Sequence, residues 1–145
     1  MRLVVDTNIV ASGLLWHGPS RRLMDLARSG EVALFTSAPL LDELARILAR
    51  DRFRRKLQEL SIDREELVLG YAELANVIAP ALIGEVIKKD PSDDHVLACA
   101  LAAGADLIVS GDPHLQNLKH YHRMPIVRDS EALRRIEQAL RRDKA

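Results

Sequence analysis

Residues 4–8 read VVDTN: an apolar strand stops at Asp6, and two small polar side chains follow it. Residues 107–112 read LIVSGD and repeat this order, with Asp112 just beyond the apolar run. In an open parallel sheet, ligands gather outside the carboxyl ends of the strands. Two strands that end in Asp at such an edge therefore predict one acidic site and not scattered surface charge.

Short apolar runs alternate with longer helical patterns along the rest of the chain. The runs predict strands at residues 2–5, 32–36, 77–79, 107–109 and 124–127. The longer segments predict helices at residues 20–30, 37–50, 52–60, 63–76, 90–104 and 130–141. This alternation favours an α/β sandwich with a mainly parallel sheet.

The composition limits the classes of function. The chain has 145 residues, and we expect a single domain over residues 1–145, with its core at about residues 2–130. Lysine plus arginine and aspartate plus glutamate each number 21, so the chain lacks the overall basic charge typical of nucleic-acid-binding proteins. Its one cysteine, Cys99, excludes an intrachain disulfide and a thiolate metal site. With no signal-peptide pattern and no apolar run near the ~20 residues of a membrane span, we expect a cytoplasmic protein without a membrane partner.

Helix geometry separates the two acids of the segment 37–50, which we expect Ser37 to cap. At ~100° per residue, its leucines and Ile47 cluster on one face, which we expect to face the core. Asp42 points almost directly away from that face and is interpreted as a solvated acid. Glu43 lies about a right angle from it, near the helix N-terminus, where a carboxylate can lean over the edge of the sheet.

Residues 90–95 read DPSDDH and place three acids at the start of one helix. Asp90 is expected to be the N-cap, because its side chain can accept backbone N–H groups. Asp93 comes three residues later, where an acid can reach back to the cap. Asp94 lies at the border of the apolar face, as Glu43 does on its own helix. The pattern favours Asp94 as the functional acid and keeps Asp93 as the alternate.

A cluster of four carboxylates needs compensation, because like charges close together raise one another's pKa. A divalent cation supplies it, and carboxylate oxygen is the ligand that Mg²⁺ or Mn²⁺ prefers. Such an ion can activate a water and neutralise a phosphodiester. The candidate metal-binding and catalytic acids are Asp6, Glu43, Asp94 and Asp112. Candidates to support these acids or to contact substrate are Thr7, Asn8, Ser110 and His114.

The order of these motifs resembles the PIN-domain ribonuclease family, over about residues 2–130. The resemblance rests on DTN at 6–8, Glu43 early in a Leu-rich helix, Asp94 leading into HVLACA, and GADLIVSGD at 104–112. It is greatest to the VapC-like branch, the toxins of toxin–antitoxin pairs.

The resemblance implies both a fold and an activity. The fold would be a three-layer α/β/α sandwich with a mainly parallel central sheet of four to five strands. The activity would be Mg²⁺- or Mn²⁺-dependent hydrolysis of RNA by Asp6, Glu43, Asp94 and Asp112. The chain would form a homodimer and would be neutralised by a small cognate antitoxin.

The sequence also contains a run of basic residues and leaves two alternative functions open. The run could contact RNA or a partner, or form a solvated helix face; it comprises Arg50, Arg52, Arg54, Arg55 and Lys56. One rival is an aspartyl-phosphate phosphatase that uses Asp6 as its nucleophile. Such enzymes would need a second Asp where this chain has Asn8, which counts against it. The other rival is a catalytically weak PIN-like module that only binds RNA or protein, and the intact acids count against that.

Overall fold

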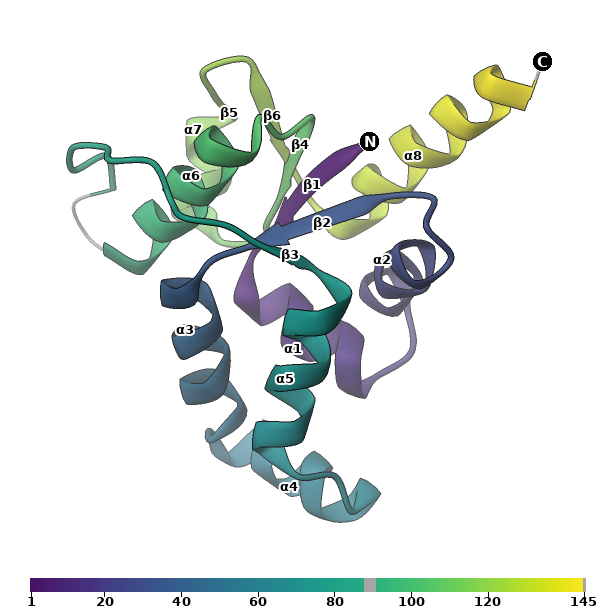
Figure 1. The fold of residues 1–145 in the computed structure, drawn as a ribbon, viewed down its shortest axis with the longest axis vertical. Helices are drawn as coiled ribbons and strands as arrows, with labels where there is room; N and C mark the ends of the chain where they lie inside the picture. The colour runs from purple at the N-terminus through teal and green to yellow at the C-terminus, as the bar shows by residue number, and fades with distance from the viewer. Residues whose placement is uncertain (88–90, 145) are drawn as a thin grey trace.

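The computed structural model describes residues 1–87 and 91–144, and it contains a sheet of six strands in the order β3-β2-β1-β4-β6-β5 (Figure 1). The strands are β1 (Arg2–Val5), β2 (Ala33–Thr36), β3 (Asn76–Val77), β4 (Leu107–Val109), β5 (His120–Tyr121) and β6 (Met124–Val127). All pairs are parallel except β5 with β6. The mainly parallel sheet is confirmed, but it has one strand more than expected. The additional strand, β5, has two residues and no apolar run to reveal it.

Eight helices are present in the described residues. They are α1 (Thr7–Leu15), α2 (Pro19–Arg28), α3 (Ala38–Leu48), α4 (Asp51–Leu60), α5 (Arg64–Leu74), α6 (Pro91–Ala103), α7 (Pro113–Leu118) and α8 (Asp129–Lys144). The sequence pattern missed α1, because its nine residues are mostly apolar and show little contrast between faces, and α7, because it has only six residues. None of the helices combines the length and the apolar composition that crossing a membrane requires.

Of the helix caps expected at Asp63 and Ser37, only Asp63 forms a side-chain cap. Asp63 caps α5, since its carboxylate accepts the Glu66 N–H at 3.1 Å. The Ser37 hydroxyl does not cap α3; it is fully buried and contacts the Cys99 thiol instead. Burial raises the pKa of Cys99 to about 11, so the thiol stays protonated, as expected of a small core residue. The expected cap Asp90 lies outside the described residues.

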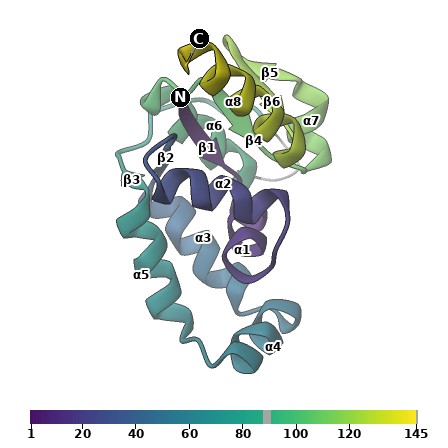
Figure 2. The ribbon, with the colours of Figure 1, turned by 90° about the vertical axis from the view of Figure 1, so that its right-hand side faces the viewer.

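The alternation of side chains along the strands builds the three layers (Figure 2). In β1, Leu3 and Val5 pack into one core, with residues of α1, α2 and α8, while Val4 packs into the other, with residues of α6. In β4, Ile108 faces the α6 side, and the two residues beside it face the opposite side. Successive strand residues point to opposite faces, so both faces of the sheet are covered, as in a parallel sheet buried on both sides.

The parallel register brings three chain segments together just beyond the strand ends. The Asp6 N–H donates to the Val109 carbonyl at 2.8 Å, and the Ser110 N–H donates to the Val127 carbonyl at 2.9 Å. The ladder therefore continues past β1 and β4. It aligns Asp6, Ser110 and the residue after β6, Arg128, along the carboxyl edge of the sheet.

Gly13, in α1, allows α2 to approach to backbone contact. A Cβ at this position would lie 2.6 Å from the Ser20 carbonyl oxygen and 2.8 Å from its carbon. These are backbone atoms that can move only with α2. We therefore expect Gly13→Ala to lower the free energy of unfolding by about 2 kcal/mol, which is the cost of overpacking less the helix propensity that alanine adds. Denaturant unfolding followed by circular dichroism measures the change.

Gly70→Ala is the matched control for this prediction. Gly70 also lies inside a helix, α5, and a Cβ there would meet no described atom within 4 Å. Alanine should raise the free energy of unfolding by about 0.5–1 kcal/mol at this position. Losses of equal size from both substitutions would show that the contact between α1 and α2 is not the cause.

Candidate functional site

Asp6 is the buried acid at the end of β1, with 5% of its surface exposed. The Ser110 hydroxyl donates a 2.7 Å hydrogen bond to its Oδ2. Burial raises the pKa of the Asp6 carboxyl above its ordinary value; the Ser110 hydrogen bond opposes this, and the charge of Asp112 adds to it. A carboxylate held in this environment is stabilised by a cation beside it.

The turn that carries Asp112 is held in place by hydrogen bonds on both sides. The Asp112 N–H donates to the Ser110 hydroxyl oxygen at 3.0 Å, so Ser110 joins Asp6 to Asp112. Asp112 Oδ1 accepts the backbone N–H of His114 at 2.8 Å, which makes Asp112 the N-cap of α7. The Gln116 amide donates to the Ser110 carbonyl. The position of the Asp112 carboxylate is therefore determined by the turn and not by solvent.

Asp93 and His114 complete a compact group with Asp112. His114 Nδ1 lies 3.7 Å from Asp93 Oδ2 and 3.7 Å from Asp112 Oδ1. One ligand atom from each of the three residues lies within 4.8 Å of the other two. Asp93 is buried, with 4% exposed surface. Among the described residues, these three side chains form the group whose ligand atoms lie close enough together to hold one metal ion.

Asp94, which the sequence pattern favoured over Asp93, points to a different part of the molecule. Its Oδ1 accepts the Ile87 N–H at 2.8 Å, and its Oδ2 accepts the Val86 N–H at 3.2 Å. Asp94 therefore holds the segment before α6. Helix geometry placed Asp94 at the border of the apolar face, and in the structure that border faces the segment at 78–87 and not the sheet edge, whereas Asp93 lies beside Asp112. Which of the two is the functional acid stays a prediction, and the position now favours Asp93.

A cleft of about 370 Å³ opens beside Asp6 and Asp112. Its far wall joins α2 to α8 through the Ser20 hydroxyl, which donates to Asp129 Oδ2 at 2.8 Å. Its lining residues are Asp6, Asn8, Ile9, Ser12, Ser20, Gly111, Asp112, Arg128 and Asp129. Sequence reasoning missed Arg128 and Asp129, although they directly follow a predicted strand, as Asp6 does.

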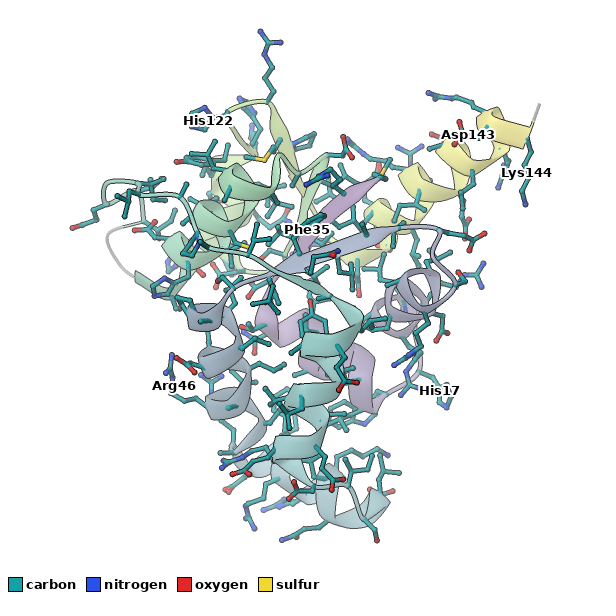
Figure 3. All side chains as sticks on the ribbon, in the orientation of Figure 1. His17, Phe35, Arg46, His122, Asp143 and Lys144 are labelled. Carbon is teal, nitrogen blue, oxygen red and sulfur yellow. The ribbon has the colours of Figure 1, made fainter. Side chains whose placement is uncertain are left out.

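The other candidates lie around this centre or away from it. Thr7 is buried beside Asp6, with its hydroxyl 3.5 Å from Asp6 Oδ1, and Asn8 lines the cleft. Glu43 lies in the second turn of α3 and is partly buried, and it is not among the described residues that line the cleft. His17 and His122 point outward from widely separated parts of the molecule (Figure 3), which agrees with their lack of metal-site spacing.

The basic run at 50–56 lies on α4 and the residue before it, at the far end of the molecule from β5 and α7 (Figures 1 and 2). The Arg52 guanidinium stacks over the Trp16 ring, 4.5 Å from its centroid, and Arg54 pairs with Asp51. None of these cations lines the cleft in the described structure. They form a partly solvated helix face, and a role in contacting RNA or a partner stays a prediction.

Comparison with known proteins adds a family and a fold. Residues 2–114 match the family model described as the PIN domain. No curated protein matches the chain. Among solved structures, a similar one is the crystal structure of VapBC2 from Rickettsia felis bound to a DNA fragment from their promoter, with 13% sequence identity and a TM-score of 0.54. The likeness covers 87% of this chain and 97% of that one, and at this identity it concerns the fold.

Proposed function

This chain belongs to the PIN domain family, and from that premise we propose that it is a metal-dependent endoribonuclease. The observation that carries the proposal is the convergence of Asp93, Asp112 and His114 within 4.8 Å, beside the buried Asp6. These side chains come from the ends of two neighbouring strands and from the starts of two helices. All four positions lie within the segment that matches the family.

The donor atoms fit Mg²⁺ or Mn²⁺. Three carboxylates and one imidazole offer mainly hard oxygen ligands, and Cys99 is buried in the core. We propose that Asp6, Asp93 and Asp112 hold the metal and that Glu43 supports it from α3. When bound, the ion would lower the pKa of a coordinated water and neutralise charge on the phosphate.

The surrounding residues fix the acids before substrate arrives. The Ser110 hydroxyl donates to the Asp6 carboxylate and accepts the backbone N–H of Asp112, so it fixes the backbone of Asp112 relative to the Asp6 carboxylate. The start of α7 holds the Asp112 side chain through the His114 N–H. Groups that are already in place need little rearrangement when charge develops, which is the main source of electrostatic catalysis. Ser110 is therefore a positioning residue.

We also propose that the chain is the toxin of a toxin–antitoxin pair, with a small cognate antitoxin and a homodimeric state. The likeness in fold to the VapBC2 structure supports this assignment. Expression of the wild-type chain should arrest growth, and a small protein encoded beside it should restore growth and co-purify with it. Native mass spectrometry of the chain alone tests the homodimer.

The nuclease proposal predicts that cleavage depends on both metal and Asp112. Wild-type protein should cleave single-stranded RNA with Mg²⁺ or Mn²⁺ and should stop when EDTA is added. Asp112→Asn should lower the rate by about 10²–10³-fold, because asparagine removes the charge. Asparagine is also a good N-cap, so α7 should stay folded. A fluorescent RNA assay measures the rate.

Asp42→Asn is the control for that experiment. Asp42 is exposed on α3, so its substitution removes the same charge without touching the site. Cleavage that survives EDTA, or that Asp112→Asn leaves unchanged, would remove the proposed mechanism. RNA binding without any cleavage would favour the binding module, and phosphate captured on Asp6 would favour the phosphatase.

A further inference from the structure

The cleft beside Asp6 contains one cationic side chain among the described residues that line it. Asp6, Asp112 and Asp129 contribute carboxylates to this lining, and Arg128 contributes the guanidinium. RNA is a polyanion, and it must approach these acids for the proposed reaction to occur. Electrostatic repulsion opposes that approach, so a cation within the cleft has a direct effect on substrate binding.

The backbone determines where this cation lies. Arg128 follows β6 directly, and the carbonyl of the preceding residue accepts the Ser110 N–H at 2.9 Å. The Arg128 backbone therefore runs beside the turn that carries Asp112. The guanidinium reaches over that turn: its Nη1 lies 3.7 Å from the point where a Cβ on Gly111 would stand. The cation is thus next to the residue that precedes Asp112.

No ion pair to the guanidinium is formed by the residues that the structure describes. The adjacent Asp129 instead accepts the Ser20 hydroxyl on one oxygen and the Ser130 N–H on the other, each at 2.8 Å. The Arg128 side chain is exposed. An arginine that stabilised the fold would be expected to pair with the adjacent acid. This one is left open to an anion from solution.

We propose that Arg128 binds a backbone phosphate of single-stranded RNA at the cleft side of Asp112 and so aligns the strand with the acids. The inference rests on the proposed nuclease function. The planar guanidinium presents paired N–H donors that match two phosphate oxygens, which a point charge does not reproduce. Since a phosphate carries no sequence information, the contact contributes affinity for any RNA sequence.

RNA binding in an Asp112→Asn background tests the proposal without cleavage. Adding Arg128→Ala should weaken the binding of a fluorescent single-stranded RNA about tenfold, by a similar factor for unrelated sequences. The slope of log affinity against log salt should fall by about 0.7, the value for one lost contact to single-stranded RNA. Arg128→Lys should restore the salt slope but only part of the affinity.

Arg142→Ala is the matched control. Arg142 is exposed on α8, the helix that begins directly after Arg128, and lies about 20 Å along it, where the helix extends away from the sheet (Figure 1). Arg142→Ala should leave both the RNA affinity and its salt slope nearly unchanged. Mn²⁺ affinity of Arg128→Ala, measured by calorimetry in the wild-type background, should stay equal or increase slightly. That result separates a lost phosphate contact from a damaged metal site.

Three results would overturn the inference, and they are distinguishable. If RNA binds and Arg128→Ala behaves like Arg142→Ala in affinity and salt slope, the Arg128 contact is absent while the nuclease proposal stands. If the wild-type protein neither binds nor cleaves RNA, the proposed function and this inference fail together. A fall in Mn²⁺ affinity that matches the fall in RNA affinity would also reject the phosphate contact, because the effect would then act through the metal site.

Discussion

Asp93→Asn is expected to lower the rate of metal-dependent RNA cleavage by about 10²–10³-fold, whereas Asp94→Asn should leave the rate within about threefold of wild type. The two residues are adjacent in the chain and differ by one helical step. Asp93 is buried and lies 3.7 Å from His114, but Asp94 accepts the N–H groups of Val86 and Ile87. Comparing the two substitutions therefore distinguishes the loss of a metal ligand at Asp93 from the loss of a nearby negative charge at Asp94.

Of these two variants, Asp94→Asn should lose more stability, whereas Asp93→Asn should lose more activity. Asparagine at 94 has one oxygen for two N–H donors, so Asp94→Asn should cost about 1 kcal/mol of unfolding free energy. Asp93→Asn should instead weaken Mn²⁺ binding. Initial rates, Mn²⁺ calorimetry and denaturant unfolding measure the three quantities on both variants. Greater loss of activity in Asp94→Asn than in Asp93→Asn would reassign the third acid to Asp94.

Asp6→Asn should lower the rate of cleavage about as much as Asp93→Asn does. It should nevertheless raise the melting temperature of the metal-free protein. Burial raises the pKa of Asp6 above its ordinary value of 3.8, so the fold favours the neutral carboxyl. The resulting stabilisation is complete below the ordinary pKa and is lost as the pH rises through the raised one. The amide is neutral at every pH and avoids this loss. Thermal melts in EDTA at about pH 4 and about pH 7.5 measure the effect.

The gap in melting temperature between Asp6→Asn and wild type should be wider at the higher pH. Asp42→Asn is again the control, since an exposed carboxylate should give no such widening. Mg²⁺ or Mn²⁺ should then raise the melting temperature of the wild type more than that of Asp6→Asn, because a ligand stabilises the state that binds it. A mutant that melts below the wild type in EDTA at both pH values would contradict the argument that burial of the ionised Asp6 carboxylate destabilises the fold.

The sheet and two of its acids could be predicted because strand ends are readable from the sequence. Asp6 and Asp112 each follow an apolar run, and the parallel order of β1 and β4 brings them to one edge. The choice within the doublet at 93–94 could not be read in the same way. It depends on the segment at 78–87, whose N–H groups receive Asp94, and no local pattern shows that segment lying against α6.

Arg128 and Asp129 show a different reason for a missed prediction. Both follow a strand that was predicted, so the strand-end argument applies to them as well as to Asp6. They follow β6, which lies beside β4 in the sheet, so they reach the same edge as Asp112. Neighbours in a sheet are set by tertiary pairing, and the order β1-β4-β6 is not visible along the chain.

The position of β6 and α8 also bears on how the chain folds as a unit. The family match stops at residue 114, before β6 and α8. Yet β6 lies between β4 and β5, and Ile136 of α8 is almost fully buried in the core that α8 shares with α1 and α2. A chain cut at 114 would lack β6, so β4 would become an edge strand with one side unpaired, and that core would be exposed to water. We therefore expect that the boundary of family similarity is not a boundary of cooperative unfolding, and that the last 31 residues unfold together with the first 114.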